Sequence, residues 1–382
     1  MSFLLDGVMA VTWQQIVMYV VGIVLIWLAV KKEYEPSLLL PMGFGAILVN
    51  LPFSGVIDQV VQGKVEAAGI IQWLFESGIE ASEAMPILLF IGIGAMIDFG
   101  PLLSQPVLFL FGAAAQFGIF AAIVIACLMG FDLKDAASIG IIGAADGPTS
   151  ILVSQVLDSN YMGPIAVAAY SYMALVPIIQ PFAIKLVTTH KERSIHMEYN
   201  PKSVNKALRI SFPIAVTIIV GFISPQSVAL VGFLMFGNLL RECGVLNSLS
   251  QAAQNELANI ITLLLGITIS FSMRAEQFVN GATIMIMALG LVAFVFDTIG
   301  GVIFAKIVNV FLKMAGKKPV NPMIGGCGIS AFPMSSRVVQ KLAAQEEPGN
   351  IILMQAAGTN VSGQVASVIA GGLVISVVTQ YL

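Results

Sequence analysis

An aspartate stands inside a long apolar stretch of this chain, where the residues around it do not favour a continuous helix. Asp146 lies in the run GIIGAADGPTSILVS, and no basic residue is nearby in the sequence. A carboxylate at membrane depth costs on the order of 3 kcal/mol, so an acid in such a position normally has a function. Gly143, Gly147 and Pro148 interrupt the helix, and backbone freed in this way can line an ion site. We therefore expect Asp146 to belong to an ion site at membrane depth.

Three segments supply polar side chains at this depth. They contain Asp146, Thr149 and Ser150; Asn321, Ser330 and Arg337; and Thr359, Asn360, Ser362 and Gln364, with Tyr170, Ser171 and Tyr172 as the counterpart of the third segment in the first half. One acid among hydroxyls and amide carbonyls is a ligand set for a hard cation, and a single carboxylate favours a monovalent ion over Ca²⁺. The sequence has no histidine and cysteine cluster of the kind that binds zinc.

Two interpretations stay open for several of these residues. Serine and threonine are common packing residues in membrane helices, so Ser150, Thr359 and Ser362 have that reading beside the functional one. Arg337 either reaches out to the cytoplasmic surface along its alkyl stem or holds an anion at the inner mouth of the site.

The composition places all these residues in a polytopic membrane protein. Of 382 residues, 58% are hydrophobic and 10% are charged, and the mean hydropathy is +0.93. Soluble domains are about a quarter charged. The first apolar run, residues 13–30, is long enough to span a membrane and lacks a small-residue cleavage site, so we expect a retained helix. The net charge of -3 does not favour a nucleic-acid partner, and the three scattered cysteines suggest packing residues.

Charge in the connections predicts the orientation. Residues 55–85 carry five acids against one base, whereas residues 185–209 carry six bases against two acids. The positive-inside rule then places 185–209 in the cytoplasm and 55–85 outside. Counting crossings between them leaves residues 137–156 with no crossing to make, so we expect this segment to dip in from outside and return. The second half aligns with the first in inverted orientation, so its corresponding segment, residues 320–341, is expected to dip in from the cytoplasm.

The two halves of the sequence resemble each other weakly but in the same order. EPSLLLPMGFGAILVNLPFSG (35–55) aligns with SPQSVALVGFLMFGNLLRECG (224–244), IGAADG (142–147) aligns with IGGCGI (324–329), and Tyr172 falls opposite Asn360. Inverted repeats with a broken segment in each half are typical of transporters, whose site lies at the midplane where the breaks meet. We therefore expect an all-α polytopic membrane protein of inverted-topology repeats, with about 9–11 membrane helices and two re-entrant segments.

This prediction divides the chain into four parts. They are an N-terminal transmembrane helix (1–34), a first inverted repeat (35–190), a cytoplasmic basic loop with a connecting helix (191–223) and a second inverted repeat (224–382).

The motifs GAADGPTSI, NPMIGGCGISAFPMSSR and GTNVSGQ, in this order, resemble those of the β subunit of the sodium-pumping biotin-dependent decarboxylases. This family acts on oxaloacetate, methylmalonyl-CoA or glutaconyl-CoA, and the resemblance extends over nearly the whole chain. It implies a carboxybiotin decarboxylase that exports Na⁺ and consumes a proton taken from outside. Na⁺ and carboxybiotin are the cofactors that it implies. The chain has no AMKM-like biotinylation sequence, so the biotin must be carried by another polypeptide.

The resemblance also implies roles for individual residues. The family's essential membrane aspartate falls on Asp146 and its functional tyrosine on Tyr172. Its functional asparagine, glycine, serine and arginine fall on Asn321, Gly325, Ser330 and Arg337, and a further sodium-site asparagine falls on Asn360. Asp146, Asn321, Ser330, Asn360 and Tyr172 would then hold Na⁺, Asp146, Tyr172, Ser330 and Arg337 would take part in catalysis, and Arg337 and Gly325 would bind carboxybiotin.

The resemblance implies partners and a location as well. The partners are a biotin carrier subunit, a carboxyltransferase α subunit, a small membrane γ/δ subunit, membrane lipid and further copies of this chain. The location is a bacterial or archaeal cell (inner) membrane. A Na⁺-coupled secondary transporter, either a Na⁺/anion symporter or a Na⁺/H⁺ antiporter, fits the architecture equally well, and only the family motifs favour the decarboxylase. Either Asp146 or Tyr172 is expected to relay the proton.

Overall fold

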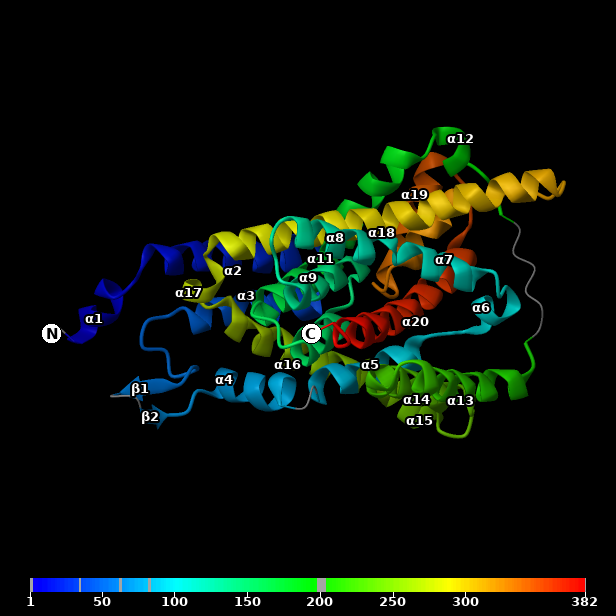
Figure 1. Cartoon of the computed structure of the whole chain (residues 1–382). Helices are drawn as coiled ribbons and strands as arrows, with labels where there is room; N and C mark the ends of the chain where they lie inside the picture. Colours follow the sequence, from blue (N-terminus) through cyan, green and yellow to red (C-terminus); the bar gives the residue numbers. More distant parts are fainter. Residues whose placement is uncertain (1–2, 34–35, 62–63, 82–83, 198–203, 382) are drawn as a thin grey trace.

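The computed structural model describes residues 3–33, 36–61, 64–81, 84–197 and 204–381, and within them it is helical apart from one two-stranded hairpin (Figure 1). Seven of these helices are long and apolar enough to cross a membrane, or up to eight if Ile70–Glu80 and Ala84–Met96, bent by 66°, form one span. The prediction of an all-α polytopic membrane protein is therefore confirmed. The count is lower than the about 9–11 expected from apolar length, because several expected crossings are divided into shorter helices.

The first half of the chain contains α1 to α12. Its elements are α1 (Phe3–Met9), α2 (Trp13–Lys32), α3 (Pro36–Val49), the antiparallel strands β1 (Gln59–Val61) and β2 (Lys64–Ala67), α4 (Ile70–Phe75), the π-helical turn η1 (Glu76–Glu80), α5 (Ala84–Met96), α6 (Gly100–Ser104), α7 (Leu108–Ala115), α8 (Phe117–Leu128), α9 (Leu133–Gly140), the 3₁₀ turn η2 (Ile141–Ala144), α10 (Gly147–Val156), α11 (Met162–Val187) and α12 (His190–Arg193).

The second half repeats much of this order. Its elements are α13 (Lys206–Ile223), η3 (Pro225–Ser227), α14 (Val228–Glu242), α15 (Asn247–Ala252), the π-helical turn η4 (Ala253–Leu257), α16 (Ala258–Ile269), η5 (Ser270–Met273), α17 (Ala275–Phe278), α18 (Gly281–Met314), η6 (Pro322–Gly328), α19 (Met334–Glu346) and α20 (Leu353–Val378). Each half has a π-helical turn before a short helix, then a broken segment, then a helix of 26 residues.

The helices form two groups, and each group draws on both halves of the chain. In the first, which we call the wall, α2 packs on α3, α13 on α14, α3 on α16 and α5 on α14. Glycines permit these close crossings: a Cβ on Gly94 would overlap the carbonyl of Leu234, and one on Gly237 would overlap that of Ile91. In the second group, the core, α18 packs on α7, α8, α11 and η6, and α20 packs on α7 and α19.

The core contains both of the helix breaks that the sequence predicts. After η2, Ala145 adopts the left-handed conformation (φ 51°, ψ 49°) and Asp146 is extended, before α10 begins at Gly147 with Pro148 in its first turn. In the second half, η6 ends in the extended Ile329. The backbone N–H of Ser330 donates to the carbonyl of Ala144 at 2.9 Å, so the two breaks are in direct contact. Their entry from opposite sides of a membrane, and the inverted relation of the halves, stay predictions.

The acidic and basic connections lie at opposite ends of the molecule. Figure 1 shows the β1–β2 hairpin of the acidic connection at the left end, whereas α12 of the basic connection lies at the right. Parts of both connections, at 62–63, 82–83 and 198–203, and the expected boundary at 34–35 lie outside the described residues. The other boundaries of the four-part division stay predictions, although α2 packs on α3 just as α13 packs on α14.

Candidate functional site

Asp146 connects the first break to the helix that follows it. Its side chain caps α10, where Oδ1 accepts the N–H of Thr149 at 3.3 Å. An aspartate in extended conformation suits this position, because its short carboxylate reaches the unpaired N–H groups of the first helical turn. The residue is only 3% exposed. The break therefore holds a carboxylate in the interior of the core.

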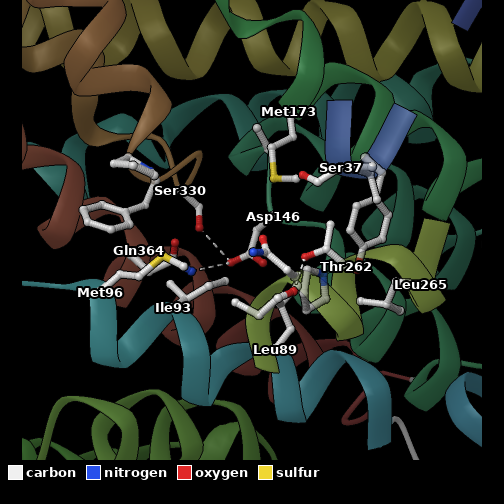
Figure 2. A pocket seen from close by; sticks show the side chains of 18 residues that line it. Ser37, Leu89, Ile93, Met96, Asp146, Met173, Thr262, Leu265, Ser330 and Gln364 are labelled. Atoms are coloured by element: carbon white, nitrogen blue, oxygen red, sulfur yellow. Dashed lines mark hydrogen bonds between the residues drawn. The ribbon is translucent and has the colours of Figure 1, made fainter. Parts of the chain in front are cut away.

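The other carboxylate oxygen of Asp146 is the centre of a polar cluster. Oδ2 accepts from the Ser330 hydroxyl at 2.9 Å, from the Ser367 hydroxyl at 2.8 Å and from Gln364 Nε2 at 3.5 Å. Figure 2 shows Ser330 and Gln364 pointing toward Asp146 from different elements. Within the described residues, no basic side chain ion-pairs with this carboxylate. The donors that reach it from the described residues are all neutral, so this carboxylate has the chemistry of a cation ligand.

One face of α20 carries the polar side chains of this cluster. Asn360, Gln364 and Ser367 follow each other at spacings of four and three, which align them along a helix. Asn360 Nδ2 donates to the carbonyl of Ile329, next to Ser330, at 2.8 Å. Ser367 was missed by the sequence analysis, although its spacing from Gln364 was a signal that could have found it. By contrast, the Ser362 hydroxyl donates to the carbonyl of Phe109 at 3.0 Å and so joins α20 to α7.

Several oxygens near the breaks have no hydrogen-bond partner among the described residues. They are Thr149 Oγ1, Tyr170 OH, Thr359 Oγ1 and Asn360 Oδ1, and all four are buried. A buried polar atom without a partner costs free energy, and a native structure normally provides a partner, water or an ion. Oxygen atoms of this kind suit a hard cation such as Na⁺. The donor set therefore fits the monovalent cation expected from the sequence.

A cavity of about 200 Å³ lies against Asp146, between the wall and the core. The wall contributes Leu89 and Ile93 from α5 and Thr262 from α16, and the core contributes Asp146 and Ser330 (Figure 2). Small-molecule sites usually measure about 300–1,000 Å³. In this conformation the cavity can accommodate an ion with a few waters and is smaller than most small-molecule sites.

The two tyrosines on α11 have different surroundings. Tyr170 is buried and lines the cavity, and a Cβ on Gly147 would overlap its ring, which explains the glycine after Asp146. Tyr172 lies two residues further, on another face of the helix. Its hydroxyl donates to the carbonyl of Met287 on α18. The structure therefore places Tyr170 beside the site and does not bring Tyr172 into contact with Asp146.

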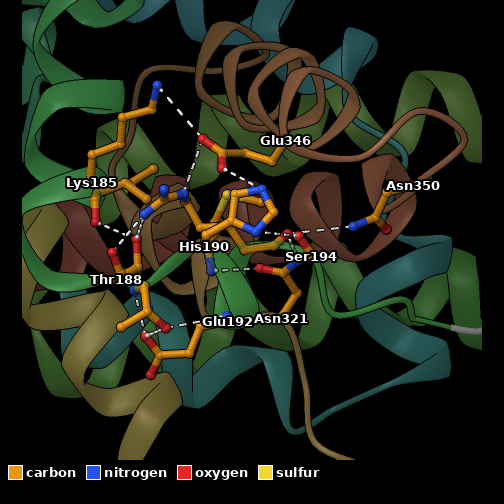
Figure 3. A network of polar contacts seen from close by, with 12 residues as sticks. Lys185, Thr188, His190, Glu192, Ser194, Asn321, Glu346 and Asn350 are labelled. Carbon is orange, nitrogen blue, oxygen red and sulfur yellow. Dashed lines mark hydrogen bonds and ion pairs between the residues drawn. The ribbon is translucent and has the colours of Figure 1, made fainter.

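Asn321 lies in a separate polar network around α12 (Figure 3). Its Nδ2 donates to the carbonyls of Arg193 and Ile195, at 2.7 and 2.9 Å, while its Oδ1 accepts the N–H of Met323 at 3.1 Å. In the same network Glu346 of α19 pairs with Arg193 at 3.1 Å. Asn321 thus links the basic connection to η6 through hydrogen bonds. The structure does not bring Asn321 to Asp146.

Gly325 is a packing residue in this arrangement. A Cβ on Gly325 would overlap the carbonyl of Gly301 on α18, and one on Gly301 would overlap the carbonyl of Gly325. Only glycine at both positions lets the backbones of η6 and α18 approach this closely. Gly325 is not among the described residues that line the cavity of about 200 Å³ beside Asp146.

Arg337 lies between the cavity and the basic end of the molecule. Phe332 and Pro333 line the cavity, and Arg337 follows Pro333 by one turn of α19, where its N–H donates to the Pro333 carbonyl at 3.4 Å. Its side chain is exposed and has no ion-pair partner among the described residues. The far end of α19 carries Glu346 of the α12 network, so this helix leads from the cavity to the basic connection.

A second buried acid was missed by the sequence analysis. Asp297 lies near the middle of the 34-residue helix α18 and is 0% exposed. The expectation that Asp146 is the single acid at membrane depth is therefore wrong. The signal was present in the apolar run LVAFVFDTIGG, but this run has no helix break beside the acid.

Comparisons with known proteins agree with the motifs. The model of the family described as "Na+-transporting oxaloacetate decarboxylase beta subunit" matches residues 14–378. The methylmalonyl-CoA decarboxylase subunit beta of Propionigenium modestum is 46% identical, with 94% of each chain covered. The glutaconyl-CoA decarboxylase subunit beta of Acidaminococcus fermentans is 45% identical, over 98% of this chain and 96% of the relative. The oxaloacetate decarboxylase beta chain of Klebsiella pneumoniae is 39% identical, with 97% of each chain covered.

Proposed function

Because this chain belongs to the family of Na⁺-transporting oxaloacetate decarboxylase beta subunits, we propose that it is the membrane subunit of a decarboxylase sodium pump. In this proposal it decarboxylates carboxybiotin presented by a partner subunit. It couples this reaction to Na⁺ export, and a proton from outside is consumed. The observation that carries the proposal is the buried Asp146 carboxylate at the contact of two helix breaks, with no basic partner among the described residues.

Asp146 and Ser330 are the proposed centre of the sodium site. Asn360 Oδ1 and Thr149 Oγ1, which have no partner among the described residues, are available to complete the ion's shell, together with the Ser367 hydroxyl. Asn321 and Tyr172 reach this site only if η6 and α11 rearrange, because both side chains are engaged elsewhere in this conformation. We therefore assign them to a different state of the transport cycle.

Arg337 is the proposed anchor for the carboxyl group of carboxybiotin. A guanidinium can pair a carboxylate through two hydrogen bonds, and this one is exposed and unpaired among the described residues. When bound, carboxybiotin supplies an N-carboxyl group whose release as CO₂ requires one proton at the nitrogen. The cavity of about 200 Å³ is smaller than a usual small-molecule site and is not lined by Arg337, so in this proposal the wall moves away from the core when carboxybiotin docks. Gly325 would contribute indirectly, by keeping η6 against α18.

Protonation of Asp146 links the chemistry to transport. A neutral carboxyl group binds Na⁺ more weakly than a carboxylate does, so a proton arriving from outside favours release of the ion. Tyr170 lines the same cavity and is the nearer of the two tyrosines for a proton relay, whereas the hydroxyl of Tyr172, also on α11, is bonded to the carbonyl of Met287 on α18.

The architecture supports alternating access in this scheme. The cavity lies between the wall and the core, and each group contains elements of both halves, as inverted repeats would produce. The proposed partners are a biotin carrier subunit, a carboxyltransferase α subunit, a small membrane γ/δ subunit and further copies of this chain. The proposed location is a bacterial or archaeal inner membrane.

The experiment that tests the function measures CO₂ release from free carboxybiotin by the purified chain, with and without Na⁺. We expect sodium-dependent release that Asp146→Asn abolishes. Asp135→Asn is the matched control, because Asp135 is also buried but is paired with Ser159 and Asn160. Wild-type protein that is protected by Na⁺ against unfolding but releases no CO₂, even with a biotin carrier present, would point to a secondary transporter instead.

A further inference from the structure

Asp297 is a buried acid that the proposed mechanism does not use. Its Oδ1 accepts the N–H of Ile119 at 3.1 Å, and the N–H of Gly118 also points at the carboxyl group. The chain breaks between α7 and α8 at Gln116, so these N–H groups belong to the first turn of α8, which lacks i−4 carbonyl partners. The N–H of Ile119 also donates to the Gln116 carbonyl at 3.2 Å. One oxygen of Asp297 is thus fixed to a second broken helix within the core.

The other oxygen of Asp297 has no hydrogen-bond donor among the described residues. It faces η2 instead, where a Cβ on Gly143 would lie 3.0 Å from Oδ2 and 2.8 Å from the Cβ of Ala293. An ionised carboxylate with one bare oxygen in an apolar interior is strongly unfavourable, and such groups become neutral instead. A protonated oxygen supplies its own hydrogen and needs no donor.

The surroundings of Asp297 favour a proton over Na⁺. A sodium ion needs several oxygens around it, whereas Oδ2 has no hydrogen-bond partner among the described residues and lies against the Gly143 backbone, close to the Ala293 methyl group. The unpartnered hydroxyl of Thr298 belongs to the next residue of the helix, whose side chain points about 100° away around the axis. The Asp146 cluster, by contrast, has hydroxyl and amide oxygens on several elements.

Other titratable groups of the packed helices are engaged elsewhere or lie far from Asp297. Three of them donate to backbone carbonyls: Tyr172 of α11 to Met287, Lys134 of α9 to Asp158, and Cys327 of η6 to Ser335. Two form ion pairs: Lys185 of α11 with Glu346, and Lys306 of α18 with Glu192. Asp135 of α9 accepts from Ser159 and Asn160, Cys127 of α8 is exposed, and Tyr170 of α11 lines the cavity. Lys313 lies in the last turn of α18. None of these described groups neutralises Asp297, which leaves Asp146 as the acid on the other side of η2.

We propose that Asp297 is a second ion-binding site of the core, which holds a proton in this conformation and is coupled to the sodium site through η2. This inference depends on one part of the proposed function, the sodium site at Asp146. Gly143 touches Asp297 and lies three residues before Asp146, so a change of charge at Asp297 acts on the segment that positions the sodium ligand. Loss of the proton adds negative charge near Asp146 and strengthens sodium binding, and by linkage sodium binding weakens the hold on the proton.

Infrared spectroscopy of the purified chain at neutral pH tests the proton directly. We expect a protonated-carboxyl band that Asp297→Asn removes and that the Asp135→Asn control retains. Asparagine keeps the oxygen that accepts from Ile119, so the fold is expected to persist. If that variant does not fold, wild-type protein with isotopically labelled aspartate gives the same answer in saturating Na⁺, where Asp146 is ionised and a shifted band belongs to Asp297. The absence of such a band would overturn the proposal.

The coupling is tested by the Na⁺ concentration that gives half-maximal protection against thermal unfolding, measured over a range of pH. In the wild type this concentration should fall as the pH rises. Asp297→Asn should still be protected by Na⁺ but should lose part of that pH dependence, and Asp135→Asn should retain it. An Asp297→Asn profile identical to that of the wild type would overturn the coupling. If the proposed function were wrong, the result would be different. Na⁺ would still protect Asp146→Asn against unfolding, while the infrared band of Asp297 would be unchanged.

Discussion

At the scale of single residues, Ser367 shows that helical spacing, as well as sequence motifs, identifies the residues of a site. Its hydroxyl lies 2.8 Å from Asp146 Oδ2, as close as that of Ser330, which belongs to the recognised motif. Asp146 and Ser330 could be predicted, because an acid or a serine beside glycines in an apolar run is unusual. Tyr170 and Tyr172 could not be distinguished, because their different surroundings depend on which face of α11 meets α18.

We predict that Ser367→Ala weakens sodium binding about tenfold, since a hydrogen bond or ligand at a charged group contributes about 1.5–3 kcal/mol. The matched control is Ser362→Ala on the same helix, whose hydroxyl donates to the Phe109 carbonyl and does not reach Asp146. Sodium-dependent protection against thermal unfolding measures both. Equal sodium affinities for the two variants would remove Ser367 from the site.

At the scale of elements, the breaks are positioned by contacts between segments that are far apart in the sequence. The glycines and prolines of residues 142–148 and 322–333 predict that the helices are interrupted there. The contact of Ser330 with Ala144, and of Gly325 with Gly301, joins segments that no local pattern connects. Asp297 has no helix break beside it in the sequence, and the break that binds it, at the start of α8, is 178 residues away.

We predict that Gly325→Ala destabilises the chain by about 1–3 kcal/mol, the usual cost of overpacking a close contact. Gly326→Ala is the control, because its nearest neighbours are side-chain atoms of Ile184 at 3.2 Å, which can adjust. Thermal unfolding in detergent measures the difference. If Gly325→Ala kept wild-type stability and lost only carboxybiotin decarboxylation, Gly325 would contact the cofactor and our packing interpretation would be contradicted.

At the scale of the whole molecule, charge and apolar length predict the arrangement of the chain across a membrane. The β1–β2 hairpin of the acidic connection and α12 of the basic connection lie at opposite ends in Figure 1, as the positive-inside rule requires of connections on opposite sides. Among the described residues seven helices, or up to eight, are long and apolar enough to span a membrane, fewer than the about 9–11 expected from apolar length, because apolar runs do not reveal where a helix is divided. The division into wall and core was not predicted, since it depends on which faces of the helices pack together.

We predict that a membrane-impermeant thiol reagent labels Gly55→Cys, but not Lys191→Cys, in intact cells. Both positions are exposed, and the background carries serine at Cys127, Cys243 and Cys327. Both variants should react once the membrane is permeabilised, which controls for accessibility. Labelling of Lys191→Cys in intact cells would reverse the orientation and place the carboxybiotin entrance on the wrong side.

The most direct measurement is sodium accumulation in proteoliposomes that contain the chain, driven by carboxybiotin added at the face of α12. The account predicts uptake of Na⁺ in step with CO₂ release in the wild type, and loss of both in Asp146→Asn. An Asp146→Asn protein that still accumulates Na⁺ at the wild-type rate would contradict the claim that this buried carboxylate carries the ion.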